Sequence, residues 1–149
     1  MNKKITILEI LPALIIISMC LFTGFTVNED IDIMEKLLKD RTNIMQNCIY
    51  GEINCSEGEE QLGKIEMYPL LAEDIKSLRQ WDFTQLDVVN NMKIINSNRI
   101  KKVFDYTTYK VSIIWDMSGL SDKYILTEDY YVVIKKVGKN NYLSSFEPI

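Results

Sequence analysis

The chain has 149 residues, of which 47% are hydrophobic and 26% charged, with 17 basic and 21 acidic side chains. This length and composition are typical of one folded domain and exclude a disordered chain. The sequence contains no histidine, which excludes Ser-His-Asp and Cys-His catalysis, histidine-ligated zinc and an imidazole pH switch. The net charge of −4 argues against a nucleic-acid partner bound through a broad basic surface.

Residues 1–27 are predicted to form a membrane anchor, an uncleaved signal-anchor. Residues 5–27 are apolar except for Glu9. A helix of that length is about 35 Å long, enough to cross a hydrocarbon core of roughly 30 Å. Lys3 and Lys4 precede this stretch and acidic residues follow it. We therefore expect a single-pass protein of the cell membrane, with its amino terminus in the cytoplasm and its carboxyl-terminal domain extracytoplasmic.

Other interpretations of the same segment stay open. A cleaved signal peptide has the same basic-then-apolar order, although residues 22–27 lack an A-x-A-like cleavage pattern. The run 17–20, which ends at Cys20, resembles a bacterial lipobox and implies lipid attachment there, with Met19 where that family has a small residue. The run 5–9 resembles the start of type IV pilins and pseudopilins, which implies that Glu9 pairs with a neighbouring subunit. Lys4 departs from that family, and Glu9 is otherwise a carboxylate close to the cytoplasmic interface.

Residues 28–33 form a short acidic linker, and residues 34–149 are expected to form the extracytoplasmic domain. Asp32 and Glu35 have the spacing of a capping box, and apolar residues spaced three and four apart predict a helix that ends at about Gly51. Glutamates at residues 57–60 indicate the start of a short second helix. Pro69 is placed to open a third, with Leu71, Ile75 and Leu78 on one face.

From about residue 86 the hydrophobic period changes to two, which predicts strands. We expect a strand over residues 92–103 that is interrupted by the polar run 96–98. Further strands are expected over residues 109–115, 124–137 and 142–149, with turns at residues 118–122 and 138–141. The fold class is therefore α+β: an amino-terminal transmembrane helix, then two or three helices packed on a curved antiparallel sheet of about four strands.

The last part of the chain shows a family resemblance. A long strand over residues 130–137, the turn 138–141 and a short strand over residues 142–146 resemble the end of small exported bacterial members of the nuclear transport factor 2-like and cystatin-like superfamily. That resemblance implies a cone-shaped domain with a pocket between sheet and helices. It also implies relatives that are enzymes, ligand binders, or scaffolds of secretion and conjugation machines.

Cys48 and Cys55 lie seven positions apart on either side of Gly51, in the part of the chain expected outside the cytoplasm. We predict a disulfide between them, and closing so short a loop stabilises a fold by about 2–3 kcal/mol. The alternative is that Cys48 is buried in the helix stripe and Cys55 is a free thiol. The absence of a C-x-x-C motif argues against a redox-active pair.

The candidate binding residues are aromatic side chains of the predicted strands: Tyr106, Tyr109, Trp115, Tyr130 and Tyr131. Tyrosine offers a large contact area at a small entropic cost, which favours a binding surface, and the alternative is a core with hydroxyl groups at its rim. Arg99, Lys101 and Lys102 are interpreted as guards of a strand edge, with anionic lipid as the alternative contact. No catalytic residue, metal site or cofactor is predicted.

These observations predict a non-enzymatic, membrane-anchored extracytoplasmic domain that binds another protein, in a cell-envelope, secretion or conjugation assembly. Residues 5–27 are its expected contact with the lipid bilayer. One alternative is an exported domain that binds a small ligand in a pocket between helices and sheet. The other is a pseudopilin-like subunit, which depends on Glu9.

Overall fold

The computed structural model describes residues 29–80 and 87–149. The predicted membrane anchor, residues 1–27, therefore lies outside the described residues. Within the described ranges, no helix combines the length and the apolar character needed to span a membrane. The chain divides into two units, residues 1–32 and 33–149, and the second contains the sheet with the helices that pack on it.

Three helices are present in the described part of the chain. The first covers residues 29–49, followed by α2 (Cys55–Leu62) and α3 (Leu70–Gln80). The predicted linker, residues 28–33, is therefore wrong from residue 29 on, because this stretch is already the first turn and a half of the helix. The first helix ends where expected, because Gly51 takes the left-handed conformation with φ of +73°, which glycine adopts without steric cost. The side chain of Asn54 caps α2 by accepting a hydrogen bond from the Glu57 amide.

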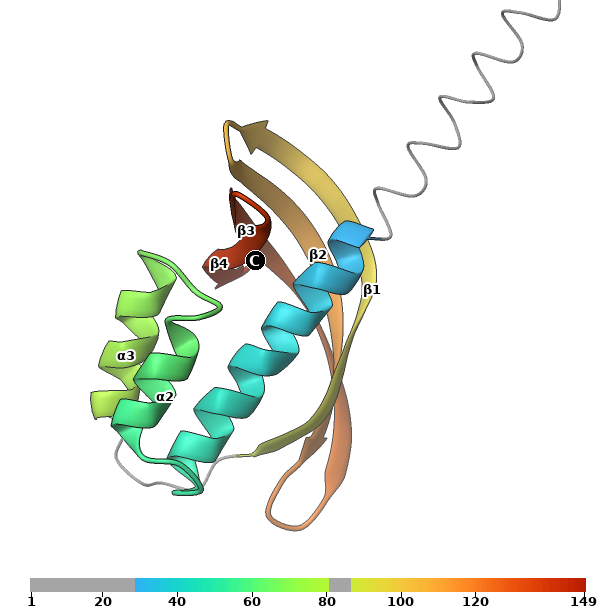
Figure 1. The fold of residues 1–149 in the computed structure, drawn as a ribbon. Coiled ribbons are helices and arrows are strands. Elements are labelled where there is room, and N and C mark those ends of the chain that lie inside the picture. The colour runs from blue at the N-terminus through green and yellow to red at the C-terminus, as the bar shows by residue number, and fades with distance from the viewer. Residues whose placement is uncertain (1–28, 81–86) are drawn as a thin grey trace, which may run out of the picture. The chain divides into compact units, whose positions relative to one another are not determined.

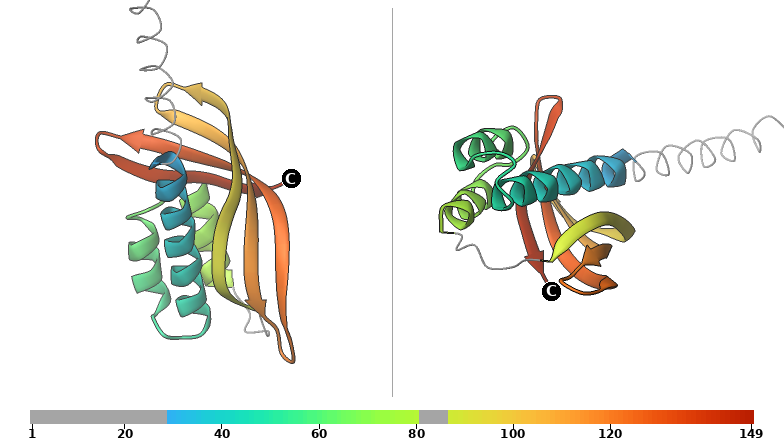
Figure 2. Two further views of the ribbon diagram at one scale, coloured as in Figure 1. Left: turned by 90° about the vertical axis from the view of Figure 1, so that its right-hand side faces the viewer. Right: turned by 90° about the horizontal axis from the view of Figure 1, so that it is seen from below.

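The sheet has four antiparallel strands joined by hairpins, in the order β1 (Val88–Val103), β2 (Tyr106–Ser118), β3 (Lys123–Val137) and β4 (Asn140–Pro148). The predicted α+β class and the antiparallel four-stranded sheet are thus confirmed. The strands are strongly curved, and the helices lie on the concave side (Figures 1 and 2).

The predicted interruption of the first strand is wrong. β1 continues through the polar run, with Asn96 opposite Ser112 and Asn98 opposite Lys110 on β2. Register shifts on either side of this run, at Ile94/Asn96 and Arg99/Lys101, absorb the irregularity as bulges. Bulges bend and twist a strand without ending its pairing, so the polar residues mark curvature of a continuous strand.

The helical layer is attached to both edge strands of the sheet. On the β1 side, the Gln46 side chain accepts a hydrogen bond from the Val89 amide (2.6 Å) and donates one to its carbonyl (3.1 Å), and Glu35 accepts one from the Ile94 amide (3.0 Å). On the β4 side, residues 65–67 pair with Leu143 in a short parallel bridge, with two backbone hydrogen bonds of 2.8 Å. These contacts pair backbone groups that an edge strand otherwise leaves open.

The predicted disulfide is absent, because Cys48 and Cys55 are both free thiols. Cys48 is buried in a hydrophobic cluster between the helices with Ile44, Leu62 and Leu78, and burial raises the pKa of its thiol. Its sulfur lies so close to Gly58 that a Cβ added to that glycine would be 2.1 Å away. Cys55 is exposed at the start of α2. The alternative stated from the sequence, a buried Cys48 and a free Cys55, describes the structure.

Candidate functional site

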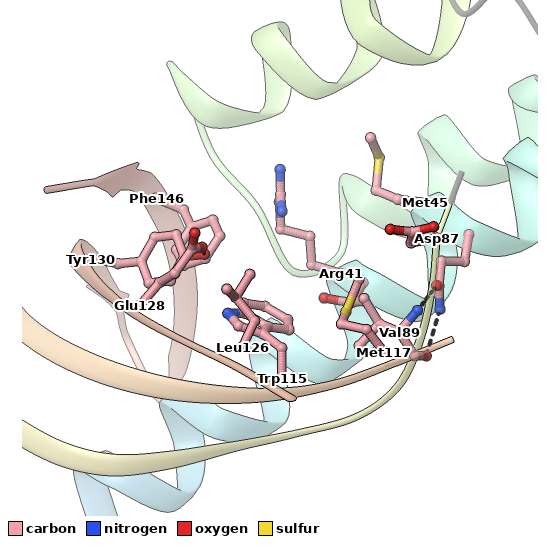
Figure 3. A pocket seen from close by; sticks show the side chains of 12 residues that line it. Arg41, Met45, Asp87, Val89, Trp115, Met117, Leu126, Glu128, Tyr130 and Phe146 are labelled. Atoms are coloured by element: carbon pink, nitrogen blue, oxygen red, sulfur yellow. Dashed lines mark hydrogen bonds between the residues drawn. The ribbon is translucent and has the colours of Figure 1, made fainter. Parts of the chain in front are cut away.

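A pocket of about 350 Å³ lies between the first helix and the concave face of the sheet (Figure 3). Its wall is formed by the first helix, by all four strands and by Asp87, the residue just before β1. The lining residues are Arg41, Thr42, Met45, Gln46, Asp87, Val89, Trp115, Met117, Leu126, Glu128, Tyr130 and Phe146. Its volume is at the lower end of the range of small-molecule sites, roughly 300–1,000 Å³.

The two periodicities of the backbone bring these side chains together. Trp115 and Met117 are two residues apart on β2, so they share the concave face of the sheet, and Leu126 shares it with Glu128 and Tyr130 on β3. On the helix, the pairs 41/45 and 42/46 are four residues apart and lie on one side. The pocket therefore follows from side-chain alternation in the strands and from the helix phase.

Three aromatic rings form one wall of the pocket. Tyr130 and Phe146 are stacked, with ring centroids 4.4 Å apart and planes 17° apart. Trp115 meets both edge-on, at centroid distances of 6.0 Å and 6.5 Å. The guanidinium carbon of Arg41 lies 5.3 Å from the Phe146 ring centroid, within the range of a cation–π contact. Stacked and edge-on rings hold one another in place, so the wall is preformed.

The carboxylates at the pocket already have partners. Glu128 accepts a hydrogen bond from the Tyr130 hydroxyl, and Asp87 accepts one from the Tyr124 hydroxyl. Burial, together with Glu128, raises the pKa of Tyr130, so this hydroxyl stays protonated and remains a donor. Neither carboxylate is paired with a basic residue in the bonds it makes here.

The indole N–H of Trp115 is buried beside the Tyr130 hydroxyl. Trp115 is 8% exposed, and within the part of the chain that the structure describes no acceptor meets full hydrogen-bond geometry at this N–H, although the indole acts on the Tyr130 hydroxyl and lowers its pKa. A buried donor without an acceptor costs free energy comparable to a lost hydrogen bond. Because the nitrogen itself has almost no accessible surface, the pocket presents the apolar and aromatic walls to a ligand and not this N–H.

A buried charged cluster anchors Arg41 at the edge of the pocket. Its guanidinium forms two hydrogen bonds with Asp74, of 2.6 and 2.7 Å, and its Nε lies 3.3 Å from the carboxylate of Glu66. Glu66 is 1% exposed and accepts no hydrogen bond from the described residues. Burial, with the neighbouring charge of Asp74, raises the pKa of Glu66 to about 8, whereas Arg41 lowers it. Arg41 is therefore held at the edge of the pocket by its two hydrogen bonds to Asp74 and by its contact with Glu66, whose protonated form burial favours.

The five predicted binding residues are divided between the two faces of the sheet. Trp115 and Tyr130 line the pocket, and Tyr109 is buried on the same face without lining it. Tyr106 and Tyr131 are an odd number of residues from these on their strands, so they lie on the outer face, where they are 39% and 42% exposed. The prediction thus joined two surfaces that the sheet separates.

The sequence pattern does not indicate the helical side of the pocket, Phe146 or the buried cluster. The predicted buried face of α3 is Leu71, Ile75 and Leu78, whereas the residues buried are Leu70, Asp74 and Leu78. One signal for the cluster was present: Arg41 stands among the apolar residues of the first helix, where burial of a cation requires an acidic partner. No pattern in α3 identified Asp74 as that partner.

Among the described residues, no three or more Cys, Asp or Glu side chains are grouped so that they could hold a metal ion. No protein-family model matches the chain, and no curated protein matches its sequence. Inference about its function therefore rests on the geometry of the domain.

Proposed function

We propose that this chain is a membrane-anchored, extracytoplasmic domain that binds a small, largely apolar ligand in the pocket between the first helix and the sheet. The observation that carries the proposal is the preformed aromatic wall of Trp115, Tyr130 and Phe146, which borders a pocket of about 350 Å³. Preformed apolar pockets with a few placed polar groups are the usual form of small-molecule sites. The membrane anchor is proposed from the apolar character of residues 5–27 in the sequence.

The chemistry of the wall favours a neutral ligand with an aromatic or similarly flat apolar body, which would pack against the aromatic cluster and the apolar side chains of β2 and β3. An anionic ligand is disfavoured because Arg41, the cation at the pocket, is already paired with Asp74, while Asp87 and Glu128 add negative charge.

The proposal is tested with 2-naphthol, a flat aromatic probe with one oxygen, titrated calorimetrically into the full chain in lipid nanodiscs, with empty nanodiscs as the blank. Leu126→Trp places a large ring in the pocket and is expected to weaken binding at least about tenfold, the equivalent of about 1.4 kcal/mol. Ile125→Trp is the matched control. Ile125 is the preceding residue of β3, on the outer face and 73% exposed, so binding is expected to be unchanged. Absence of saturable binding to the wild-type chain, or equal binding by both variants, contradicts the proposal.

A second candidate function, binding of another protein in a cell-envelope, secretion or conjugation assembly, is favoured by a separate surface. Tyr106 and Tyr131 lie exposed on the outer face of the sheet, away from the pocket. Exposed tyrosine is enriched at protein interfaces. Glu9, on which the pseudopilin-like alternative depends, lies outside the described residues.

A further inference from the structure

The charges of the domain are separated along its length. Residues 99–110 and 135–139, which include the β1–β2 and β3–β4 turns, carry seven basic side chains and one acidic one. Residues 116–128, around the β2–β3 turn, carry three acidic side chains and one basic one. In the antiparallel meander, the β1–β2 and β3–β4 turns lie at one end of the sheet and the β2–β3 turn lies at the other (Figures 1 and 2). The sheet thus has a basic end and an acidic end, while the start of the first helix adds the acidic residues 29, 30, 32 and 35.

Two hairpins meet at the basic end. The Lys136 amide donates a hydrogen bond of 2.8 Å to the Asp105 carbonyl in the β1–β2 turn, and the ammonium of Lys135 lies 4.9 Å from the Tyr106 ring centroid. These contacts place the lysines of β3 beside the turn. The resulting surface is called the basic hairpin tip, and it consists of Arg99, Lys101, Lys102, Phe104, Lys135 and Lys136.

An apolar side chain projects from the centre of this basic surface. Phe104 is 91% exposed and has a positive φ of +51°, uncommon for a residue with a side chain. Its neighbours Ile100 and Val103 are 57% and 42% exposed. Aromatic and aliphatic side chains surrounded by cations are the pattern of segments that lie at an anionic membrane interface.

The basic hairpin tip lies at the same end of the domain as the start of the first helix, where the chain enters the domain. The start of the first helix and the β1–β2 turn lie at the same end, and the turn extends further in that direction (Figures 1 and 2). Hydrogen bonds agree with this arrangement. The start of the first helix lies beside the later part of β1, where Glu35 contacts Ile94, and its end lies beside the beginning of β1, where Gln46 contacts Val89. From residue 27, the last of the predicted span, to residue 33 the chain reaches at most about 20 Å. With residues 5–27 as the anchor, so short a tether keeps the domain close to the bilayer surface.

We propose that the basic hairpin tip docks on anionic lipid headgroups of the membrane in which the chain is anchored, with Phe104 inserted into the interface. The complementary charge supplies attraction, and the exposed ring supplies apolar contact. The opposite, acidic end is then turned away from the same membrane. This inference rests on the anchor of the proposed function and is independent of the ligand pocket.

The test uses the full chain reconstituted in vesicles of phosphatidylcholine and phosphatidylglycerol whose acyl chains carry bromine, a short-range quencher of indole emission. Phe104→Trp introduces an indole at the basic tip. Leu120→Trp is the matched control, because Leu120 is 77% exposed in the β2–β3 turn at the other end. We expect bromine to quench the additional emission of the first variant and to leave that of the second unchanged, with wild-type emission subtracted.

Charge is tested in the same assay. Lys101→Glu with Lys102→Glu, in the Phe104→Trp background, is expected to abolish the quenching, as is replacement of phosphatidylglycerol by phosphatidylcholine. Retention of the chain in vesicles after alkaline carbonate washing reports the anchor separately. A retained chain whose indole at position 104 is not quenched, or is quenched to the same extent as that at position 120, overturns the docking proposal. Loss of the chain on washing refutes the anchor, and docking with it, while binding of 2-naphthol still reports on the pocket.

Discussion

Glu66 is an acidic side chain that the fold keeps buried and protonated. It shares Arg41 with Asp74, but the two hydrogen bonds of the guanidinium go to Asp74. A single cation neutralises one of the two carboxylates, and burial makes a second negative charge costly. The proton on Glu66 is therefore part of the native structure at neutral pH.

This arrangement predicts a pH dependence of stability. The pKa of Glu66 is raised from its ordinary value of 4.5 to about 8 in the folded protein. Between these values the folded state binds more protons than the unfolded state, so the free energy of unfolding falls as pH rises. The free energy of unfolding falls by at most about 1.4 kcal/mol per pH unit through this group. The stabilising contribution of Glu66 is fully present below its pKa in the unfolded chain and is lost as pH rises through its pKa in the folded protein.

Glu66→Gln isolates the contribution, because the amide has the same shape and does not titrate. Urea unfolding of both chains over pH 5–8, monitored by circular dichroism, is expected to show the wild-type protein losing stability relative to the variant as pH increases. A difference between the two chains that is independent of pH would show that Glu66 titrates normally.

At the scale of elements, the close approach of α2 to the first helix depends on one glycine. Gly58 is buried inside α2, facing the sulfur of Cys48 in the first helix. Glycine lowers helix stability, so its presence in a helix interior requires a packing reason. Here the reason is the space occupied by the sulfur.

Gly58→Ala is therefore expected to destabilise the domain by about 1–3 kcal/mol through overpacking, measured by urea unfolding. Adding Cys48→Ala removes the sulfur and is expected to restore most of this loss. Gly63→Ala is the control, since a Cβ there meets its nearest atom at 3.5 Å and the backbone is helical, so stability is expected to change little. Equal losses in the single and double variants would place the cost in the backbone of α2 and not in this contact.

At the scale of the whole molecule, contacts at both sheet edges join the helices and the sheet into one body. Leu143 has no exposed surface, and its backbone pairs with residues 65–67, the segment between α2 and α3. Loss of packing on β4 therefore removes support from the helical layer as well. We expect the described domain to unfold as one cooperative unit.

Leu143→Ala is expected to cost about 2–5 kcal/mol, as for other buried leucines. In a Trp81→Phe background, where Trp115 of β2 is the remaining tryptophan, sheet unfolding followed by fluorescence and helix unfolding followed by far-ultraviolet circular dichroism are expected to shift together to lower urea. Separate transitions, with helical signal remaining after the fluorescence change is complete, would show that the two layers are independent.

Much of the fold could be predicted because its signals are local. Gly51 ended the first helix where expected, Pro69 immediately precedes α3, and alternation identified β2 and β3. The continuity of β1, in contrast, is not determined by its own local sequence. Its polar run is held in the sheet by β2, a partner about fifteen residues further along the chain. Pairing with a partner strand overrides the local tendency of such residues to bend.

The sequence by itself determined the order and class of the elements, because backbone periodicity and turn residues act over a few positions. It also identified Trp115 and Tyr130 as candidates for binding. Only the tertiary structure decided that these two face a pocket while Tyr106 and Tyr131 face outward, that Cys48 packs on Gly58 without joining Cys55, and that Arg41 binds Asp74. The physical reason is that burial, cavities and ion pairs depend on distances between elements, which the packing of helices on a curved sheet sets.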